Sequence, residues 1–187
     1  MEFYDHKKVD VMFSKEEIDA RIKVLGQRIT EDYLASDRPV VLIGVLKGSF
    51  LFLADLVRAI DLPIEIDFLG LSSYGDEQES SGVVRMTQDL SRSIQGKHVL
   101  VVEDIIDTGL TMEYLLKNLK TRQPESIKIA SLLSKPARAQ VNVHIDYLGF
   151  EIPDRFVIGY GLDYANLFRN LPFIGVNVGD GLPLSDR

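Results

Sequence analysis

Hydrophobic and polar positions follow one another in two patterns along this chain, one typical of amphipathic helices and one of buried strands. Ser14-Lys15-Glu16-Glu17 predicts a capping box at the start of a helix, and apolar residues follow at helical spacing as far as Tyr33. The next segment, Pro39–Leu46, is an almost unbroken run of β-branched and aliphatic residues. Such a run indicates a strand that is buried on both faces.

The rest of the chain continues this alternation of strand and helix. The pattern predicts helices at Phe50–Ile60 and Met112–Thr121, and strands at Ile64–Leu69, His98–Val102, Ile127–Leu133, Tyr147–Glu151, Phe156–Gly159 and Phe173–Val178. Residues 72–81 are polar and acidic, which predicts a mobile loop within residues 71–88, and Gly82–Asp89 can return as a hairpin arm. Strand–helix–strand units have right-handed crossovers, so we expect an α/β fold with a mainly parallel sheet and helices on both faces. One domain should span residues 1–187.

Composition narrows the classes of protein that fit. With 45% hydrophobic and 26% charged residues, the chain is an ordinary globular domain and not a disordered one. The 28 acidic and 21 basic side chains give a net charge of −7, which disfavours a general nucleic-acid binder because such proteins need a basic surface. The absence of cysteine excludes disulfides, thiolate zinc sites and cysteine nucleophiles.

The sequence also argues against a membrane or secretory segment. The N-terminal residues lack the apolar core of a signal peptide. The most apolar window, Val40–Val57, contains Lys47 and Asp55, and charges near a bilayer centre are costly. We therefore expect a soluble, cytoplasmic protein with no membrane or nucleic-acid partner.

The most informative segment is residues 103–111, which we call the central motif. It follows the buried strand at His98–Val102, and ligands of parallel sheets bind beyond the carboxyl ends of the strands. Its three carboxylates, Glu103, Asp104 and Asp107, fall within five positions and repel one another. A metal ion or a sugar diol would compensate for this repulsion.

The second half of the central motif has the chemistry of a phosphate site. Thr108 and Thr111 offer hydroxyls, Gly109 lets a ligand approach the backbone, and the free amides of the following helix suit a phosphate. The motif therefore suggests a phosphorylated sugar bound with a divalent cation. The alternative is ordinary helix capping, which accounts for Asp107 and Thr108 but not for Glu103-Asp104 at the end of an apolar strand.

Three other positions carry candidate chemistry. Lys47-Gly48 lies between a buried strand and a helix, so it is either a diphosphate cradle or a turn with a solvated lysine. It is not a Walker A loop, because the spacing of that motif is absent. Lys135 follows an apolar strand and can donate to an oxygen of a base, although a lone lysine there is more often solvated. Phe156 can stack on a base, but from the residues alone core packing is the better interpretation.

Two further patterns carry no function. Gly159–Ala165 loosely matches a dinucleotide-binding fingerprint, but Pro172 leaves the helix after it too short, at Asn166–Asn170, so we reject NAD binding. The histidines are scattered and match neither a catalytic nor a metal-binding spacing; they are His6, His98 and His144.

The segment Val101–Thr111 resembles the binding signature for 5-phosphoribosyl 1-diphosphate (PRPP) of the type I phosphoribosyltransferases. The resemblance runs through almost the whole chain and includes Leu46-Lys47-Gly48-Ser49, Leu71–Gly75, Ser134-Lys135-Pro136, Phe156–Tyr164 and Phe168-Arg169. The Lys135 and Phe156–Asp163 segments narrow it to the 6-oxopurine branch, with its bacterial hypoxanthine and hypoxanthine-guanine members. It implies their type of fold, with a small hood and a mobile loop.

The resemblance implies a purine salvage enzyme of the glycosyltransferase class. Such an enzyme moves the 5-phosphoribosyl group from PRPP to N9 of hypoxanthine or guanine, and it releases IMP or GMP and diphosphate. The implied cofactor is Mg²⁺, with Glu103, Asp104 and Asp163 as its ligands. Asp107 is the implied catalytic base for the purine N7 proton, and nearby like charges would raise its pKa toward the working range.

The implied substrate contacts divide the site by ligand. Lys135 reads the purine O6, Phe156 stacks on the purine and the backbone of Val157 reads the base edge, while Arg169 binds diphosphate and Ser73-Tyr74 closes over the ligands. The full implied binding set is Lys47, Gly48, Ser73, Tyr74, Glu103, Asp104, Thr108, Gly109, Thr111, Lys135, Phe156, Val157, Asp163 and Arg169. Leu110 departs from relatives that carry a lysine there. The family is usually dimeric or tetrameric.

Two alternatives remain open at the level of the sequence. One is a regulator that senses PRPP or a nucleotide and binds RNA or DNA, which the net charge of −7 disfavours. The other is a related transferase that acts on xanthine. The sequence does not rank hypoxanthine, guanine and xanthine.

Overall fold

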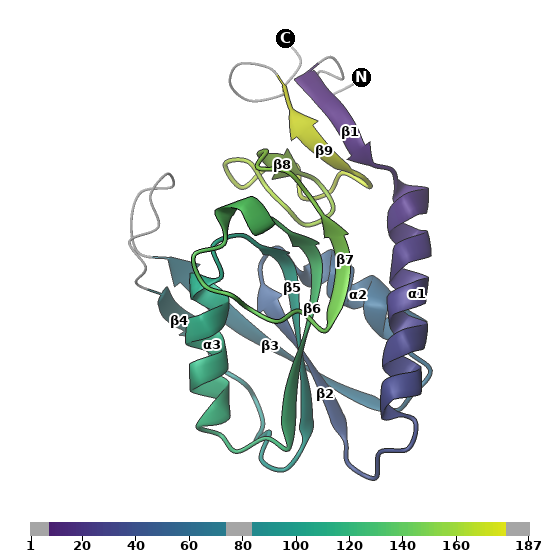
Figure 1. Ribbon diagram of the computed structural model, residues 1–187, viewed down its shortest axis with the longest axis vertical. Helices are drawn as coiled ribbons and strands as arrows, with labels where there is room; N and C mark the ends of the chain where they lie inside the picture. Colours follow the sequence, from purple (N-terminus) through teal and green to yellow (C-terminus); the bar gives the residue numbers. More distant parts are fainter. Residues whose placement is uncertain (1–7, 74–83, 179–187) are drawn as a thin grey trace.

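The computed structural model describes residues 8–73 and 84–178, which form two sheets and three long helices (Figure 1). In chain order the elements are β1 (Val9–Phe13), α1 (Lys15–Tyr33), β2 (Val40–Leu46), α2 (Phe50–Ala59), β3 (Ile64–Ser73), β4 (Val84–Gln88), β5 (His98–Ile106), α3 (Leu110–Lys120), β6 (Ser126–Ser134), the short 3-10 helix η2 (Pro136–Arg138), β7 (Tyr147–Glu151), β8 (Val157–Ile158) and β9 (Ile174–Asn177). The larger sheet has the order β4-β3-β2-β5-β6-β7 and is parallel except at β4. The expected α/β class is confirmed.

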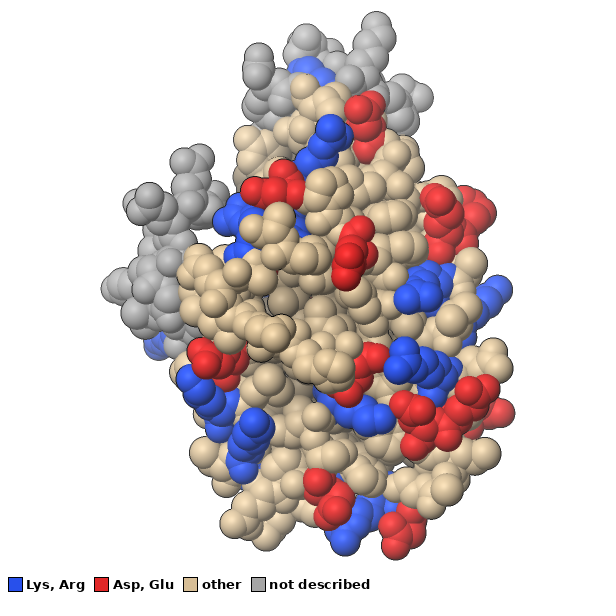
Figure 2. Space-filling view, viewed as in Figure 1, with Lys and Arg blue, Asp and Glu red and all other residues tan. Residues whose placement is uncertain are grey.

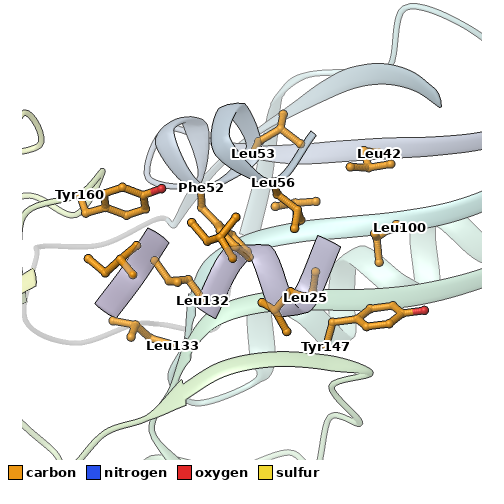
Figure 3. Packing of buried hydrophobic residues seen from close by; sticks show 14 of the residues in the cluster. Leu25, Leu42, Phe52, Leu53, Leu56, Leu100, Leu132, Leu133, Tyr147 and Tyr160 are labelled. Carbon is orange, nitrogen blue, oxygen red and sulfur yellow. The ribbon is translucent and has the colours of Figure 1, made fainter. Parts of the chain in front are cut away.

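Helices cover both faces of the larger sheet. The predicted capping box starts α1, where the Ser14 hydroxyl accepts from the amide of Glu17 at 3.2 Å and the Glu17 carboxylate accepts from the amide of Ser14 at 2.8 Å. α1 and α2 bury their apolar sides on one face, in a core that contains Phe52 and Leu100 (Figure 3). α3 buries Leu115 in a second core on the other face.

The strand register brings the candidate residues to one edge of the sheet. β2, β5 and β6 are parallel neighbours, with Gly44 opposite Val102 and Ile106 opposite Ser134. Lys47, Asp107 and Lys135 therefore follow the carboxyl ends of three neighbouring strands. This is the edge at which ligands of such sheets bind.

Several boundaries differ from the sequence prediction. β5 extends to Ile106, so Glu103 and Asp104 belong to a strand and not to a turn. β3 extends to Ser73 and β4 pairs with it as the expected hairpin arm, while residues 74–83 of the predicted mobile loop lie outside the described residues. Residues 166–170 form turns and not a short helix.

The smaller sheet stands above this edge and joins the two ends of the described chain (Figure 1). It has the order β1-β9-β8, with Val9 opposite Asn177, and the sequence pattern did not predict β1. We call this sheet, together with residues 159–173, the hood, and residues 159–173 the hood loop. Val9, Ile158 and Phe168 form its own small apolar cluster.

The described surface is mixed in charge. Figure 2 shows lysine and arginine side chains interspersed with aspartate and glutamate on one face, so no broad basic patch covers that face. Within residues 8–73 and 84–178, no helix is both long and apolar enough to cross a membrane.

Candidate active site

Three chain segments meet closely at the carboxyl edge of the sheet. A Cβ atom on Gly48 would lie 1.5 Å from Oδ2 of Asp104, and one on Gly161 would lie 2.0 Å from the carbonyl oxygen of Gly48. Glycine is therefore required where the Lys47-Gly48 turn passes between β5 and the hood loop. The peptide bond between Leu46 and Lys47 is cis, and the Lys47 side chain is exposed.

The central motif encloses a cavity of about 200 Å³. The cavity is lined by Glu103, Asp104, Ile105, Ile106, Asp107, Thr108, Gly109, Thr111 and Met112. Gly109 has a φ of 82° and is the N-cap of α3, so the free amides of that helix begin inside the motif. The phosphate site that the sequence predicts at this helix start stays a prediction, and the cavity lies at that position.

The two acids at the end of β5 differ in their hydrogen-bond partners. Oδ1 of Asp104 accepts from the amide of Ile105 at 2.8 Å, whereas Oε2 of Glu103 is covered and has no hydrogen-bond partner. Burial and the neighbouring Asp104 charge raise the pKa of Glu103 well above its ordinary value, and burial also raises the pKa of Asp104. A buried acceptor without a partner is costly, so the pair is suited to a cation or to sugar hydroxyls.

The three implied metal ligands do not converge. Among the described residues no three His, Cys, Asp or Glu side chains form a cluster that could hold a metal ion. Asp163 instead forms an ion pair with Nη2 of Arg169 at 2.6 Å and accepts from the amide of Asn166 at 2.8 Å. Glu103 and Asp104 fit Mg²⁺ together with substrate oxygens, because Mg²⁺ is usually bound by one or two carboxylates plus phosphates and water.

Asp107 lies where two cavities adjoin. It lines the central-motif cavity and also a second cavity of about 660 Å³, whose other lining residues, apart from Ile106, lie between Ser134 and Glu151 and include Lys135 but neither Phe156 nor Val157. Nε of Arg138 is 2.8 Å from Oδ1 of Asp107. From the sequence, only carboxylates are expected around Asp107. The structure adds the guanidinium of Arg138, which is the last residue of η2. No motif in the sequence marks this residue.

Lys135 is buried, with 7% of its surface exposed. Its amide donates to the carbonyl of Ile106 at 2.9 Å, and its Nζ is 3.7 Å from a carboxylate oxygen of Asp154. Oδ1 of Asp154 is also 3.5 Å from Nη1 of Arg138. The alternative of an ordinary solvated lysine is therefore wrong, because the side chain is hardly exposed. A buried ammonium needs polar partners, and Asp154 is one of them.

Phe156 and Val157 have opposite surroundings. Phe156 is 55% exposed and meets Tyr164 edge to face, with the ring centroids 5.4 Å apart, whereas Val157 is buried in β8. The core-packing interpretation of Phe156 is wrong, since its ring lies at the surface of the hood. An exposed ring of this kind is able to stack on a base.

The remaining candidates lie around the same edge. Nη1 of Arg169 donates to the carbonyl of Gly161 at 2.7 Å, which holds the guanidinium on the hood loop. The hydroxyl of Thr108 accepts weakly from the amide of Leu110, at 3.4 Å. Ser73 is the last residue of β3, and Tyr74 lies outside the described residues.

Comparisons with known proteins agree with this geometry. Residues 14–165 match the phosphoribosyl transferase domain family. The chain is 51% identical to the hypoxanthine phosphoribosyltransferase of Haemophilus influenzae over 168 residues, covering 89% of this chain and 94% of that protein. It is 48% identical to the hypoxanthine-guanine phosphoribosyltransferase of Bacillus subtilis over 166 residues, covering 89% and 91%. A crystal structure of a hypoxanthine phosphoribosyltransferase from Staphylococcus aureus superposes with a TM-score of 0.87 at 43% identity, covering 92% of this chain and 93% of that one.

Proposed function

This chain belongs to the phosphoribosyl transferase family, and from that premise we propose how its own residues carry out the reaction. The protein is a purine salvage enzyme that transfers the 5-phosphoribosyl group of PRPP to N9 of a 6-oxopurine, hypoxanthine or guanine. The products are IMP or GMP and diphosphate. The observation that carries the assignment of roles is that Asp107 lines both the central-motif cavity and the cavity of Lys135.

In this proposal the sugar phosphate occupies the central-motif cavity. The amides and hydroxyls of Thr108, Gly109 and Thr111 bind the 5-phosphate, because they surround the start of α3 and its dipole favours an anion. Lys47 and Gly48 bind the diphosphate, together with Arg169 of the hood loop once Arg169 has left Asp163. These contacts hold C1 of the ribose toward Asp107.

The base is bound from the other side. Lys135 donates to the purine O6, the backbone of Val157 reads the edge of the base, and the exposed ring of Phe156 stacks on it. The family resemblance adds Ser73 and Tyr74 to the proposed contacts, and Tyr74 lies outside the described residues. The low exposure of Lys135 supports this role, because a desolvated donor discriminates strongly for a carbonyl acceptor.

The chemical step forms the N9–C1 bond and breaks the bond from C1 to the diphosphate oxygen. Positive charge develops on the ribose ring, so most of the catalysis comes from positioning and electrostatic stabilisation. Asp107 accepts the N7 proton as N9 bonds to C1, and it is suited to this role because it lines both cavities and its side chain is 35% exposed. Diphosphate then leaves with the electron pair of the broken bond.

Mg²⁺ is the proposed cofactor, and it would neutralise the diphosphate and the charge of the two acids. Glu103 and Asp104 would hold it together with ribose and diphosphate oxygens, which fits the unpartnered Oε2 of Glu103. Asp163 is the third proposed ligand. It would have to break its ion pair with Arg169 before it could bind the metal ion.

The cellular setting is part of the proposal. A sugar diphosphate is strongly charged and does not diffuse through a bilayer, so we place the enzyme in the cytoplasm, where its substrate is made. We also propose one domain over residues 1–187. The protein forms a homodimer or homotetramer in this proposal, and light scattering of the purified protein tests that oligomeric state directly.

One spectrophotometric assay tests the proposed function. Purified protein, PRPP and Mg²⁺ are incubated with hypoxanthine, guanine or xanthine in turn, and nucleotide formation is followed. We expect IMP or GMP to form and to require Mg²⁺. Turnover of xanthine alone would favour the related transferase, and salt-sensitive binding to a nucleic acid with no nucleotide formed would favour the regulator.

A further inference from the structure

The hood loop contains a run of three residues with left-handed backbone, and the middle one is not glycine. Gly159, Tyr160 and Gly161 have φ angles of 93°, 48° and 100°. A left-handed backbone is unfavourable for a non-glycine residue, so the side chain of Tyr160 has to stabilise the loop by its own contacts. In the sequence these three residues belong to the rejected dinucleotide fingerprint and to the resemblance segment Phe156–Tyr164, and neither pattern gives Tyr160 a role of its own.

The side chain of Tyr160 joins the hood loop to α2. It is 5% exposed and lies in the main core beside Phe52, with its hydroxyl directed toward α2 (Figure 3). The hydroxyl donates to Oδ2 of Asp55 at 2.5 Å, across 105 positions of sequence. Arg58 pairs with the other oxygen of Asp55, which leaves Oδ2 to the tyrosine.

This hydrogen bond is a strong one of its kind. Burial, followed by the hydrogen bond to Asp55, raises the pKa of Tyr160, so the hydroxyl remains a donor throughout the physiological pH range. A bond between a neutral donor and a carboxylate is worth more than a bond between neutral groups. Without Asp55, the hydroxyl would be a buried polar group with no carboxylate partner.

The two ends of the hydrogen bond lie next to the two halves of the proposed diphosphate site. α2 begins directly after the Lys47-Gly48 turn, and Asp55 is in its second turn. On the other side, Gly161 follows Tyr160, contacts the carbonyl of Gly48 and accepts from Nη1 of Arg169 at 2.7 Å. A shift of the hood loop away from α2 would therefore move Arg169 relative to Lys47.

We propose that Tyr160 and Asp55 are positioning residues for the diphosphate end of the site: their hydrogen bond holds the hood loop at the spacing from α2 that lets Arg169 and Lys47 bind one diphosphate. This role rests on the proposed function and adds two residues that do not touch the substrate. It makes a specific prediction, because the proposed base contacts lie outside the hood loop: Lys135 follows β6, and Val157 belongs to β8, which is paired with β9. Loss of the bond should weaken binding of PRPP and diphosphate and leave base binding almost unchanged.

The test compares two buried tyrosines that make the same kind of bond. Tyr160→Phe removes only the hydroxyl. The matched control is Tyr147→Phe, because Tyr147 is fully buried on β7 and its hydroxyl donates to Oδ2 of Asp32 at 2.6 Å, away from the candidate active site. Both variants lose a tyrosine–aspartate bond, so a general loss of stability should affect both.

We expect Tyr160→Phe to raise the KM for PRPP about tenfold, the effect of about 1.4 kcal/mol. The dissociation constant of diphosphate with Mg²⁺, measured by calorimetry, should rise in parallel. The KM for hypoxanthine should change less than about twofold, and Tyr147→Phe should alter neither KM. In an Asp55→Ala background, Tyr160→Phe should have no further effect on PRPP, because the bond is already absent.

An unchanged KM for PRPP in Tyr160→Phe, with a melting temperature lowered as in Tyr147→Phe, would overturn the proposal and leave Tyr160 a core residue. An equal rise in both KM values would also overturn it. The dissociation constant of diphosphate is measured by calorimetry without turnover. It therefore tests the positioning role of Tyr160 and Asp55 independently of whether the protein forms a nucleotide. A wild-type protein that forms no nucleotide from any 6-oxopurine would instead contradict the proposed function.

Discussion

Asp107 illustrates how much a single side chain depends on neighbours that are distant in sequence. Its Oδ1 is covered and lies 2.8 Å from Nε of Arg138, so the 35% of the side chain that is exposed belongs to its other atoms. Arg138 thus holds one side of the carboxylate while the other remains open toward the cavities. A base that is oriented by a third group is a recurrent arrangement in enzymes.

At this scale the prediction concerns Asp107→Asn. The amide keeps the size of the side chain and loses the ability to accept the N7 proton, so kcat should fall by about 10²–10⁴-fold. The KM values for PRPP and hypoxanthine should change only a few-fold. Steady-state kinetics measures both effects, with Asp37→Asn, an exposed carboxylate outside the site, as the control. An unchanged turnover number would remove Asp107 from the role of base.

At the scale of elements, β5 combines a buried strand with two acids at its carboxyl end. Val99–Val102 are completely or almost completely buried, and the same strand continues through Glu103 and Asp104 to Ile106. Burial raises the pKa of Glu103 well above its ordinary value. The ligand-free fold is therefore destabilised wherever Glu103 has to be ionised.

The sign of the pH dependence follows from that direction. Because the pKa of Glu103 is higher in the folded than in the unfolded state, its contribution to stability is full below the ordinary carboxyl pKa and is lost as the pH rises through the folded pKa. Glu103→Gln should therefore increase the free energy of unfolding of the ligand-free protein at neutral pH by on the order of 1 kcal/mol, with a smaller gain in acid.

Urea unfolding at a series of pH values measures this difference between the wild type and Glu103→Gln. Glu31→Gln serves as the control, because Glu31 is exposed on α1 and should give a difference that does not grow with pH. A variant that is less stable than the wild type at neutral pH would contradict the interpretation of Glu103 as a buried, uncompensated acid.

At the scale of the whole molecule, the site is built between two sheets. In the proposed function, Lys47, Asp107 and Lys135 follow strands of the six-stranded sheet, whereas Val157 of β8 and Asp163 and Arg169 of the hood loop belong to the hood, and Phe156 directly precedes β8. Figure 1 shows the hood above the six-stranded sheet. The Gly161–Gly48 contact and the Tyr160–Asp55 hydrogen bond join the two parts. A ligand that contacts both should stabilise the whole fold.

This arrangement predicts a thermal shift that depends on the cation. PRPP at about 100 times its Kd should stabilise the protein by about 2.7 kcal/mol, since it binds only the folded state. For a chain of this size that corresponds to an increase in Tm of about 5–10 °C. The shift, measured by differential scanning fluorimetry, should require Mg²⁺. An equal shift in the presence of EDTA would contradict the proposed role of Mg²⁺.

The sequence by itself determined most of the helices and strands and the sheet edge at which the candidate residues lie. Capping boxes, helical spacing and apolar runs are local signals, and they located α1, β2, α2 and β6 to within one or two residues. Since parallel strands present their carboxyl ends at one edge, the order of strands and helices was also enough to bring Lys47, Asp107 and Lys135 together. The family resemblance supplied the substrate and the individual roles.

Only the tertiary structure decided which distant groups contact each other. β1 pairs with β9 across almost the whole chain, Arg138 reaches Asp107, Asp163 pairs with Arg169, and Tyr160 bonds to Asp55. The physical reason is that local periodicity specifies which face of a helix or strand is apolar, but it carries no information on which polar groups meet once those faces are packed. Those pairings depend on the positions that packing gives to segments far apart in sequence.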